Sequence, residues 1–195
     1  TTISGINHIR SDWACSGAAR VAFVPTMGYL HEGHLSLVRL GKARADHVVM
    51  SIYVNKTQFN SASDYEAYPR DLDRDAELAR QAGVDVLYVP EHEEMYTSEY
   101  PVDRAVRVTA GYLASGYCGA YRPGHFDGVV LIVSKLFNIV RPDVAIFGEK
   151  DYQQLQVIRQ LVKDLCYPIE IVAAPLIRDD DGLALSSRNA RLSAP

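Results

Sequence analysis

The sequence has no excess of positive charge. Its 195 residues include 20 Lys and Arg against 24 Asp and Glu, which gives a formal net charge of −4. Proteins bind nucleic acids largely by neutralising backbone phosphates, and this composition offers no broad cationic surface for that purpose. We therefore expect no nucleic-acid partner.

Long apolar runs are absent as well. The longest stretch without Asp, Glu, Lys or Arg is the 14-residue segment Val108–Tyr121, which three glycines interrupt. A membrane-spanning helix needs about 20 consecutive, predominantly apolar residues. The sequence therefore predicts no membrane partner.

Cysteine is scarce, and no secretory signal is visible in the first 20 residues. Cys15, Cys118 and Cys166 are odd in number, far apart and without C-x-x-C spacing, which argues against a disulfide framework or a structural zinc site. The cysteines favour a reducing, cytoplasmic setting, while the absence of a visible signal leaves open that a cleaved one has already been removed. The 48% of hydrophobic and 23% of charged residues are ordinary for a globular domain and exclude wholesale disorder.

Apolar, β-branched runs alternate with amphipathic runs along the chain, which is typical of βα units. The predicted strands are residues 20–25, 47–54, 84–89, 143–147 and 169–173. The predicted helices are residues 35–45, 71–82, 126–140 and 152–165, with Gly83 as a glycine cap and Pro142 as a stop signal. The run at 47–54 has no polar face, so we expect it to be buried in a parallel sheet.

These elements predict one α/β domain over residues 1–195, with a Rossmann-like, doubly wound parallel sheet. Ligands are expected at the carboxyl ends of its strands. Two segments interrupt the pattern. Residues 55–68 are predicted to form a polar loop, and residues 91–119 an insertion over the sheet with a short strand at 105–109.

The strongest functional signal is Pro25–His34, PTMGYLHEGH, which follows the first predicted strand. A tight turn at Gly28 leads to His31 and His34, three residues apart at a helix start, where both rings can lie on one face. The N–H groups of a helix start favour anions, and imidazole can gain charge near neutral pH, so the pair suits nucleotide phosphates. Two ordinary surface histidines remain the alternative. A zinc site is disfavoured because no third ligand has local metal spacing.

A second cluster, Phe147–Gln154 or FGEKDYQQ, also follows a predicted strand. Gly148 permits close approach of the backbone, Lys150 can meet phosphate charge, and the Gln154 amide can both donate and accept hydrogen bonds. An ordinary helix start with an acidic cap would show the same residues.

The third cluster is Arg178–Asn189, RDDDGLALSSRN, in which Gly182 predicts a turn. Ser186, Ser187 and Arg188 could surround phosphate oxygens with hydroxyl, backbone and guanidinium donors. Taken alone, the segment could equally be a polar loop.

Together the three clusters resemble one family, the pantothenate synthetases, also called pantoate–β-alanine ligases. The first and third clusters are similar to the HxGH-type and KMSKS-like nucleotide motifs of its superfamily. Two further segments match, SIYVNKTQF at Ser51–Phe59 and RPGHFDGV at Arg122–Val129. The resemblance covers Arg20–Asn189 and implies a fold of the HxGH nucleotidyltransferase type.

The resemblance implies an ATP-dependent ligase that condenses (R)-pantoate with β-alanine to give pantothenate, a step of coenzyme A biosynthesis. The pantoate carboxylate would attack the α-phosphate of ATP, giving pantoyl adenylate and pyrophosphate, and the amine of β-alanine would then displace AMP. Positioning and charge stabilisation would supply most of the catalysis. Mg²⁺ is expected with ATP, and because it binds phosphates with few protein ligands, no metal-ligating residue is predicted. A homodimer is expected by the same resemblance.

Site residues follow from the matching motifs. His34 would be the acid or hydrogen-bond donor with His31 as its phosphate-binding partner, and Lys150 and Arg188 would add fixed positive charge. The implied ATP site comprises Met27, Gly28, Tyr29, Leu30, His31, Glu32, Gly33, His34, Gly148, Glu149, Lys150, Asp151, Ile177, Leu185, Ser186, Ser187 and Arg188. Pantoate would be held by Asn55, Gln58 and Gln154, with Gln58 also bordering the β-alanine position.

The sequence departs from the family pattern in three places. Lys56 stands where proline is usual, and Tyr121 where a small residue is usual. Because proline would fix the loop that presents Gln58, Lys56 is expected to loosen that loop or to bring charge near pantoate. Family members also carry a smaller carboxy-terminal lid domain after the SSRN segment, which this sequence does not reach. Since a lid excludes water from the adenylate, we expect the chain to bind ligands better than it turns them over.

Two other functions fit parts of the pattern. One is another HxGH nucleotidyltransferase that adenylylates a phosphate-bearing substrate. Gln58 and Gln154 argue against it, because amides suit the hydroxyls and carboxylate of a small acid, whereas a phosphate calls for more Lys or Arg. The other is a nucleotide-binding or dimerisation module without catalysis.

Overall fold

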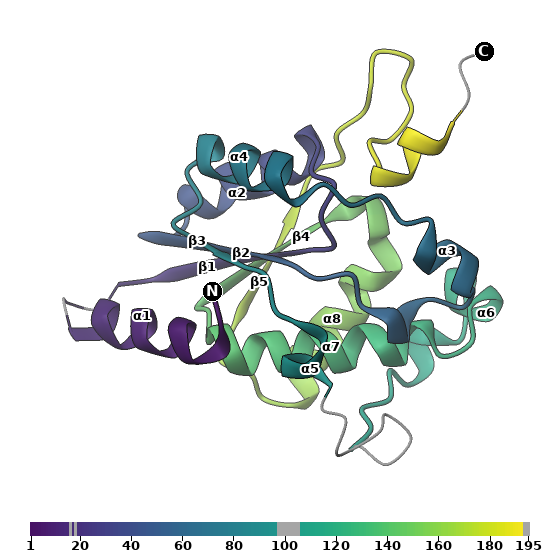
Figure 1. Ribbon diagram of the computed structural model, residues 1–195. Coiled ribbons are helices and arrows are strands. Elements are labelled where there is room, and N and C mark those ends of the chain that lie inside the picture. The colour runs from purple at the N-terminus through teal and green to yellow at the C-terminus, as the bar shows by residue number, and fades with distance from the viewer. Residues whose placement is uncertain (16, 18, 97–105, 193–195) are drawn as a thin grey trace.

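The computed structural model describes residues 1–15, 17, 19–96 and 106–192, and their core is a five-stranded sheet (Figure 1). The strands are β1 Val21–Thr26, β2 His47–Ile52, β3 Val86–Tyr88, β4 Val144–Gly148 and β5 Glu170–Ala174. The helices are α1 Ile3–Cys15, α2 Glu32–Lys42, α3 Ala62–Glu66, α4 Leu72–Ala82, α5 His92–Met95, α6 Tyr117–Tyr121, α7 His125–Val140 and α8 Tyr152–Asp164. Short 3₁₀ helices lie at η1 Lys56–Gln58, η2 Tyr112–Ala114, η3 Glu149–Asp151 and η4 Ser187–Arg191.

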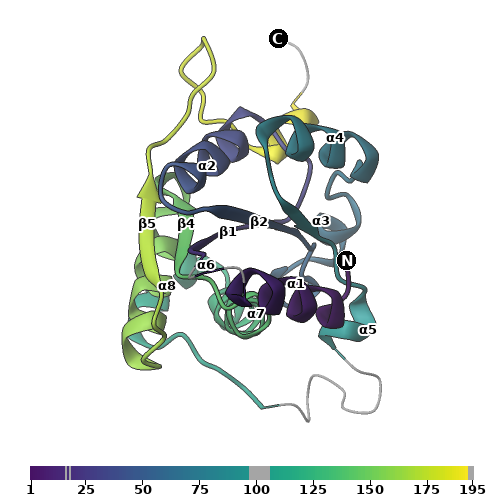
Figure 2. The same cartoon turned by 90° about the vertical axis from the view of Figure 1, so that its left-hand side faces the viewer.

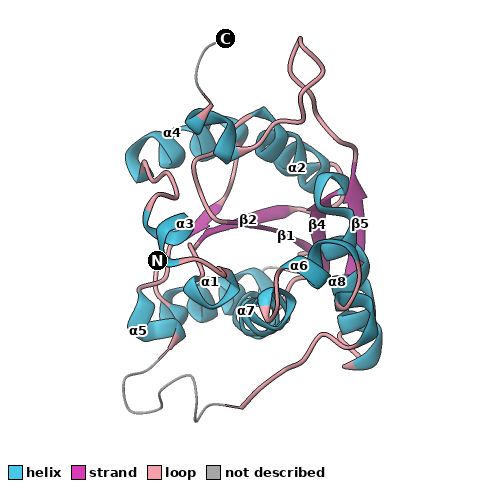
Figure 3. Ribbon diagram, turned by 90° about the vertical axis from the view of Figure 1, so that its right-hand side faces the viewer, coloured by secondary structure: helices cyan, strands magenta, loops and turns pink. Residues whose placement is uncertain are grey.

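All strand pairs are parallel, in the order β3-β2-β1-β4-β5. The chain therefore builds outward from β1 in one direction and then returns to add β4 on its other side. Helices α2 and α4 cover one face of the sheet, and α1, α5, α7 and α8 lie on the other (Figure 1, Figure 3). The predicted doubly wound α/β fold is confirmed.

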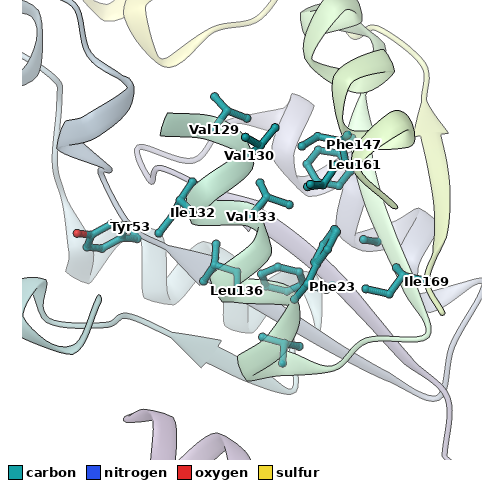
Figure 4. Close-up of a cluster of buried hydrophobic side chains, with 14 of the residues drawn as sticks. Phe23, Tyr53, Val129, Val130, Ile132, Val133, Leu136, Phe147, Leu161 and Ile169 are labelled. Atoms are coloured by element: carbon teal, nitrogen blue, oxygen red, sulfur yellow. The ribbon is translucent and has the colours of Figure 1, made fainter. Parts of the chain in front are cut away.

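The two faces of the sheet bury separate cores, and β1 serves both. Val21 and Phe23 point into the core shared with α7, whereas Ala22 and Val24 point into the core shared with α2, as the two-residue period of a strand requires. Figure 4 shows the first core, where Phe23 lies beside Val133 and Leu136 of α7. Burying each such side chain contributes about 1.5 to 3 kcal/mol. The uniform burial of β1 on both faces explains why its sequence has no polar side.

Caps end the helices near the predicted boundaries. The Asp71 carboxylate accepts the Arg74 N–H at 3.1 Å at the start of α4, and Gly83 ends this helix with a left-handed φ of +82°. Helix α7 ends at Arg141, directly before the predicted stop at Pro142. The five predicted strands and four predicted helices all exist, with ends shifted by at most three residues.

The irregular segments differ from the prediction. Residues 55–68 are not a plain loop, because η1 and α3 form there. Residues 106–109 form no strand, and Ala105 lies outside the described residues. The described parts of the predicted insertion differ. Residues 92–95 form α5 on a face of the sheet, where the Tyr88 hydroxyl of β3 donates to Met95 Sδ at 3.8 Å. Residues 106–119 pack against α7 and α8 instead: Val108 packs on the core that includes α7, and the Gln153 amide of α8 donates to Leu113 O. None of the helices described in this structure is long and apolar enough to cross a membrane.

Helix α1 is an element that strand and helix periodicity did not predict. It packs against α7, with Ile6 as its buried side chain, and most of its other residues are exposed or half-buried. One buried position gives no usable apolar period, so its helical pattern is weak.

Candidate active site

A cavity of about 240 Å³ lies at the carboxyl ends of β1 and β4, where the strand order reverses. This is the place at which open parallel sheets bind ligands. Most predicted site residues line it: Met27, His31, Gly33, His34, Asn55, Gln58, Gly148, Lys150, Asp151, Gln154, Ile177, Leu185, Ser186, Ser187 and Arg188. Segments from the two ends of the chain therefore meet in one cavity. Figure 2 shows η4 on the same side of the sheet as α2 and α4.

Five predicted residues do not line the cavity. Leu30 is fully buried in the core beneath α2, and Glu32 pairs with Arg39 on the exposed side of that helix. Gly28 and Tyr29 form the turn after β1, and Glu149 is exposed beside the cavity. Any contact of these residues with a ligand has to come from their backbone or from a rearrangement.

The two histidine rings lie against each other at the start of α2, tilted by 39°. Their ring centroids are 4.0 Å apart, and the His31 N–H donates to His34 Nδ1 at 3.3 Å. Because Nδ1 accepts this bond, the proton of a neutral His34 lies on Nε2, which leaves one N–H for a ligand. The predicted arrangement of both rings on one side of a helix start is confirmed.

Burial keeps both imidazoles neutral. Desolvation, and secondarily the positive charges of Lys150 and Arg74, lower the pKa of His31 to about 4. Desolvation, followed by His31 and Lys150, lowers the pKa of His34 to about 3. The charged imidazoles expected near neutral pH therefore do not form in the protein alone. A bound phosphate would oppose both effects by supplying negative charge and hydrogen-bond acceptors.

Lys150 of η3 and Arg188 of η4 both line the cavity, and each is paired with a carboxylate. Lys150 Nζ lies 3.0 Å from Asp151 Oδ2. Arg188 bonds Asp64 of α3 at 2.8 Å, and its guanidinium lies over the Tyr68 ring at 5.3 Å from the centroid. The Asp64 hydrogen bonds raise the pKa of Arg188, so this side chain is charged at all ordinary pH values.

The Arg188 segment is attached to the first motif by a hydroxyl. Ser187 Oγ lies 3.1 Å from Tyr29 O and 3.3 Å from Gly28 O and donates toward these carbonyls. The hairpin before it turns at Gly182, which has a φ of +85°, and closes through the bridge between Arg178 and Ala184. The predicted turn at Gly182 is confirmed.

Comparison with known proteins identifies the family of this chain. The family described as Pantoate-beta-alanine ligase matches residues 1–195. A pantothenate synthetase from Aquifex aeolicus is 51% identical over 98% of this chain and 66% of its own length. The chain belongs to the pantoate–β-alanine ligase family.

Solved structures of the family agree. The pantothenate synthetase of Thermus thermophilus superposes with a TM-score of 0.89 at 48% identity, over 99% of this chain and 67% of that one. The ligase of Francisella tularensis, complexed with β,γ-ATP and β-alanine, has a TM-score of 0.91 at 40% identity, over 99% of this chain and 72% of that one. This chain spans 60 to 66% of the length of the first curated relatives that it matches.

One predicted pantoate residue of this family member is fully engaged within the protein. The Asn55 amide donates to Gln58 Oε1 and Gly128 O, both at 3.1 Å, and accepts from the hydroxyls of Thr57 at 3.0 Å and Tyr96 at 2.9 Å. Asn55 is 1% exposed. An amide has two donors and two acceptor lone pairs, so none is left for a ligand. The bond from Asn55 takes one of the two lone pairs of Gln58 Oε1. The Gln58 NH₂ donates to the Met27 sulfur at 3.2 Å, and both side chains line the cavity.

His125 and Arg122 line the cavity, although the motif analysis assigned them no role. The His125 ring bonds Gln58 O through Nδ1 at 2.7 Å and Arg122 through Nε2 at 3.2 Å. Next along α7, Gly128 allows the close approach of η1, since a Cβ there would lie 2.6 Å from Thr57 O. The RPGHFDGV segment, used only to support the family resemblance, was the signal that could have found them.

The two substituted positions of the family pattern, Lys56 and Tyr121, do not line the cavity. Lys56 is exposed, with Nζ 5.9 Å from the Tyr65 ring centroid, and η1 forms with lysine in place of proline. Tyr121 is 89% exposed at the end of α6. Neither side chain brings charge or bulk into the described cavity.

Proposed function

We propose that this chain binds ATP and (R)-pantoate in the cavity, forms pantoyl adenylate, and transfers the pantoyl group to β-alanine to give pantothenate. A pantoate oxygen would form a bond to the α-phosphorus as the bond to the β-phosphate oxygen breaks, releasing pyrophosphate. The β-alanine amine would then form a bond to the pantoyl carbonyl carbon, lose a proton, and displace AMP. Family membership and the names of the relatives support this assignment.

The observation that carries the proposal is the convergence of two kinds of group at the strand-order switch. His34, Lys150 and Arg188 offer phosphate-binding groups, while Gln58 and Gln154 offer amides to a small polar acid. The Gln154 amide makes no hydrogen bond to the residues that the structure describes, and the Gln58 NH₂ contacts only the Met27 sulfur there. The two sets face one cavity, as an in-line transfer between a carboxylate and a phosphate requires.

Each side chain has a proposed task. The neutral His34 donates its Nε2–H to an α-phosphate oxygen, and Lys150 and Arg188 neutralise charge as pyrophosphate leaves. Glycine at 148 and the N–H groups of the α2 start bring the backbone close to the nucleotide. The amides of Gln58 and Gln154 orient pantoate, and Asn55 holds Gln58 in its orientation.

Magnesium would enter as part of the ATP substrate. No group of three or more His, Cys, Asp or Glu side chains that could hold a metal ion occurs in the described part of the chain. The cavity does hold Asp151 beside Lys150, which fits an ion bound mainly by phosphates and water. When bound, Mg²⁺ would neutralise part of the triphosphate charge.

The cavity chemistry favours a carboxylate over a phosphate-bearing second substrate. Among the described residues near Gln58 the cationic side chain is Arg122, and it already bonds Gln58 O at 3.3 Å and Asn60 Oδ1 at 3.3 Å. A second phosphate would lack an uncommitted Lys or Arg in this part of the cavity.

The experiment is a calorimetric titration of ATP·Mg²⁺ and pantoate, followed by pyrophosphate release with and without β-alanine. Pantoate-dependent release would establish adenylation by this chain, and added β-alanine should yield pantothenate. Binding of both ligands without release would support a binding module that lacks turnover. Binding of neither ligand would overturn the assignment. Sedimentation of the same sample tests the proposed homodimer.

A further inference from the structure

A buried carboxylate lies beneath the turn that carries the histidines. Asp75, in the first turns of α4, is 1% exposed. Its Oδ2 accepts the Tyr29 N–H at 2.6 Å, and its Oδ1 accepts the Leu30 N–H at 2.7 Å. Burial of a charge is costly unless hydrogen bonds compensate it, and the proposed reaction has no use for this group. The cost therefore points to a task at the turn itself.

The turn adopts a conformation that most residues avoid. Gly28 has a φ of +81° and Tyr29 a φ of +50°, so two successive residues are left-handed. This conformation is disfavoured for a residue with a side chain, because Cβ approaches the carbonyl oxygen. It turns the chain sharply between the end of β1 and His31, the N-cap residue of α2. This reversal turns the N–H groups of Tyr29 and Leu30 inward, and the Asp75 carboxylate accepts a hydrogen bond from each.

Neighbouring contacts fit tightly around the carboxylate. A Cβ on Gly28 would lie 3.0 Å from Asp75 Oδ2, so the turn and the carboxylate are already at contact distance. Arg74 Nη1 lies 3.5 Å from Asp75 Oδ1, and its guanidinium covers the Tyr29 ring at 5.1 Å from the centroid. On the opposite side of the turn, Ser187 meets the Gly28 and Tyr29 carbonyls. The peptide groups are thus held on their N–H side by α4 and on their C=O side by η4.

We propose that Asp75 is a positioning residue for the histidine pair, because its carboxylate fixes the left-handed turn from which His31 and His34 extend. Rotation of the Tyr29–Leu30 peptide would move the start of α2. The rings of His31 and His34 would then leave their positions in the cavity wall. The kinetic part of this inference rests on the proposed adenylation, whereas the geometric part does not.

If Asp75 only stabilised α4, another substitution that weakens this helix should have the same effect, and the chain offers a matched control. Asp71 is exposed, lies one turn before Asp75 on the same helix, and caps α4 through the Arg74 N–H. Asp71→Ala should weaken α4 without touching the turn. Any effect of Asp75 that acts only through helix stability would therefore appear in both variants.

The test compares Asp75→Asn with Asp71→Ala in this 195-residue chain. Asp75→Asn replaces one acceptor oxygen by NH₂, so one turn N–H loses its partner. We expect kcat for pantoate-dependent pyrophosphate release to fall about 100-fold, as displacements near 1 Å can cause, with the pantoate KM changed less than about threefold. Asp71→Ala should keep kcat within about twofold at a similar loss of thermal stability. Equal kcat losses in the two variants would overturn the proposal.

Histidine NMR separates this proposal from the proposed function. In the ligand-free protein, the ring ¹H–¹⁵N signals of His31 and His34 should shift in Asp75→Asn and stay in place in Asp71→Ala. If the wild-type chain released no pyrophosphate, adenylation would fail while the NMR comparison still decided the positioning role. Should Asp75→Asn not fold, Asp75→Glu keeps the charge but displaces the oxygens, and the same signals should shift. Unchanged histidine signals in every folded Asp75 variant would refute the inference.

Discussion

The two walls of the cavity are built in opposite ways. The inner wall, His31 and His34, begins directly after the fully buried strand β1 and is uncharged, because burial lowers both histidine pKa values. The outer wall, Ser187 and Arg188, lies on a short 3₁₀ helix after a hairpin and carries a charge paired with Asp64. One wall is therefore placed by the core, and the other by a few polar contacts.

In the proposed reaction, this difference would separate two contributions to catalysis. Neutral donors in a buried site are already oriented and act in a low dielectric, so they favour a transition state without reorganising. A half-exposed guanidinium must exchange a protein carboxylate for a phosphate, and part of its attraction is lost in that exchange. Substitutions in the inner wall should therefore change rate, and substitutions in the outer wall should change affinity.

The largest effect is expected from His34→Ala. Loss of the Nε2–H donor should lower the rate of pantoate-dependent pyrophosphate release roughly 100- to 1,000-fold, which is typical for a donor at a developing charge. The ATP Kd from calorimetry should change less than about threefold. His8→Ala, an exposed histidine on α1, is the control. Equal losses of rate and affinity would show that His34 is only a binding residue.

Arg188→Ala should show the opposite result, with ATP affinity lowered more than the rate of pyrophosphate release. We expect ATP to bind about tenfold more weakly, because a charge-assisted hydrogen bond contributes about 1.5 to 3 kcal/mol before exchange with Asp64 is counted. Calorimetry at low and moderate salt should show the loss shrinking as salt rises. Arg191→Ala is a matched control, since Arg191 also bonds Asp64 at 3.0 Å but does not line the cavity. Similar losses in both variants would place the effect in α3 rather than in phosphate binding.

Acid should lower the unfolding free energy of the protein through His34 of the inner wall. The pKa of His34 is lower in the folded protein than its ordinary value near 6.5, so the unfolded chain binds the proton first. Stability is then fully present above about pH 6.5 and is lost as the pH falls toward the folded pKa. Between pH 7 and pH 5, His34→Ala should lose about 1 to 2 kcal/mol less unfolding free energy than the wild type in urea titrations. Parallel pH profiles of the two proteins would contradict the lowered pKa.

The smallest effect is expected from Asp64→Asn, which weakens the attachment of the outer wall. Freed from its carboxylate, Arg188 should bind ATP about two- to threefold more tightly, since a half-exposed ion pair contributes less than about 1 kcal/mol. Asp73→Asn makes the same change of net charge at an exposed position of α4. Weaker ATP binding in Asp64→Asn would mean that the ion pair holds Arg188 in its working position.

The sequence predicted the inner wall better than the outer one. Apolar periodicity found all five strands. The central strands β1, β2 and β4 are largely buried, so their composition has little freedom, and the edge strands β3 and β5 are partly buried and still apolar enough to be recognised. The strand, glycine and histidine order then placed His31 and His34 at the carboxyl edge of the sheet. The Arg188 segment also reached the cavity as expected, but its partners did not follow from the pattern: Asp64 is 124 residues away along the chain.

Three parts of the site required the structure. Asp75 looks like one more acidic residue in the first turns of an exposed helix, and only the topology brings it under the Tyr29 turn. Asn55 was predicted to hold pantoate, a role that stays a prediction, but its hydrogen bonds reach Gly128 and Tyr96, which no local spacing indicates. Helix α1 was missed because one buried residue gives no period.

The central position of β1 also implies that the segments forming the two walls open locally at different rates. Amides of a strand that is paired on both sides and buried on both faces exchange with solvent only when the whole domain unfolds. The Gly28 turn continues directly from that strand, so the histidines are joined to the slowest-opening part of the molecule. The segment of Arg188 is held by a hydroxyl and an ion pair, so we expect it to open more readily than the core. In the proposed reaction, a nucleotide would then meet one wall that stays in place and another that can open locally.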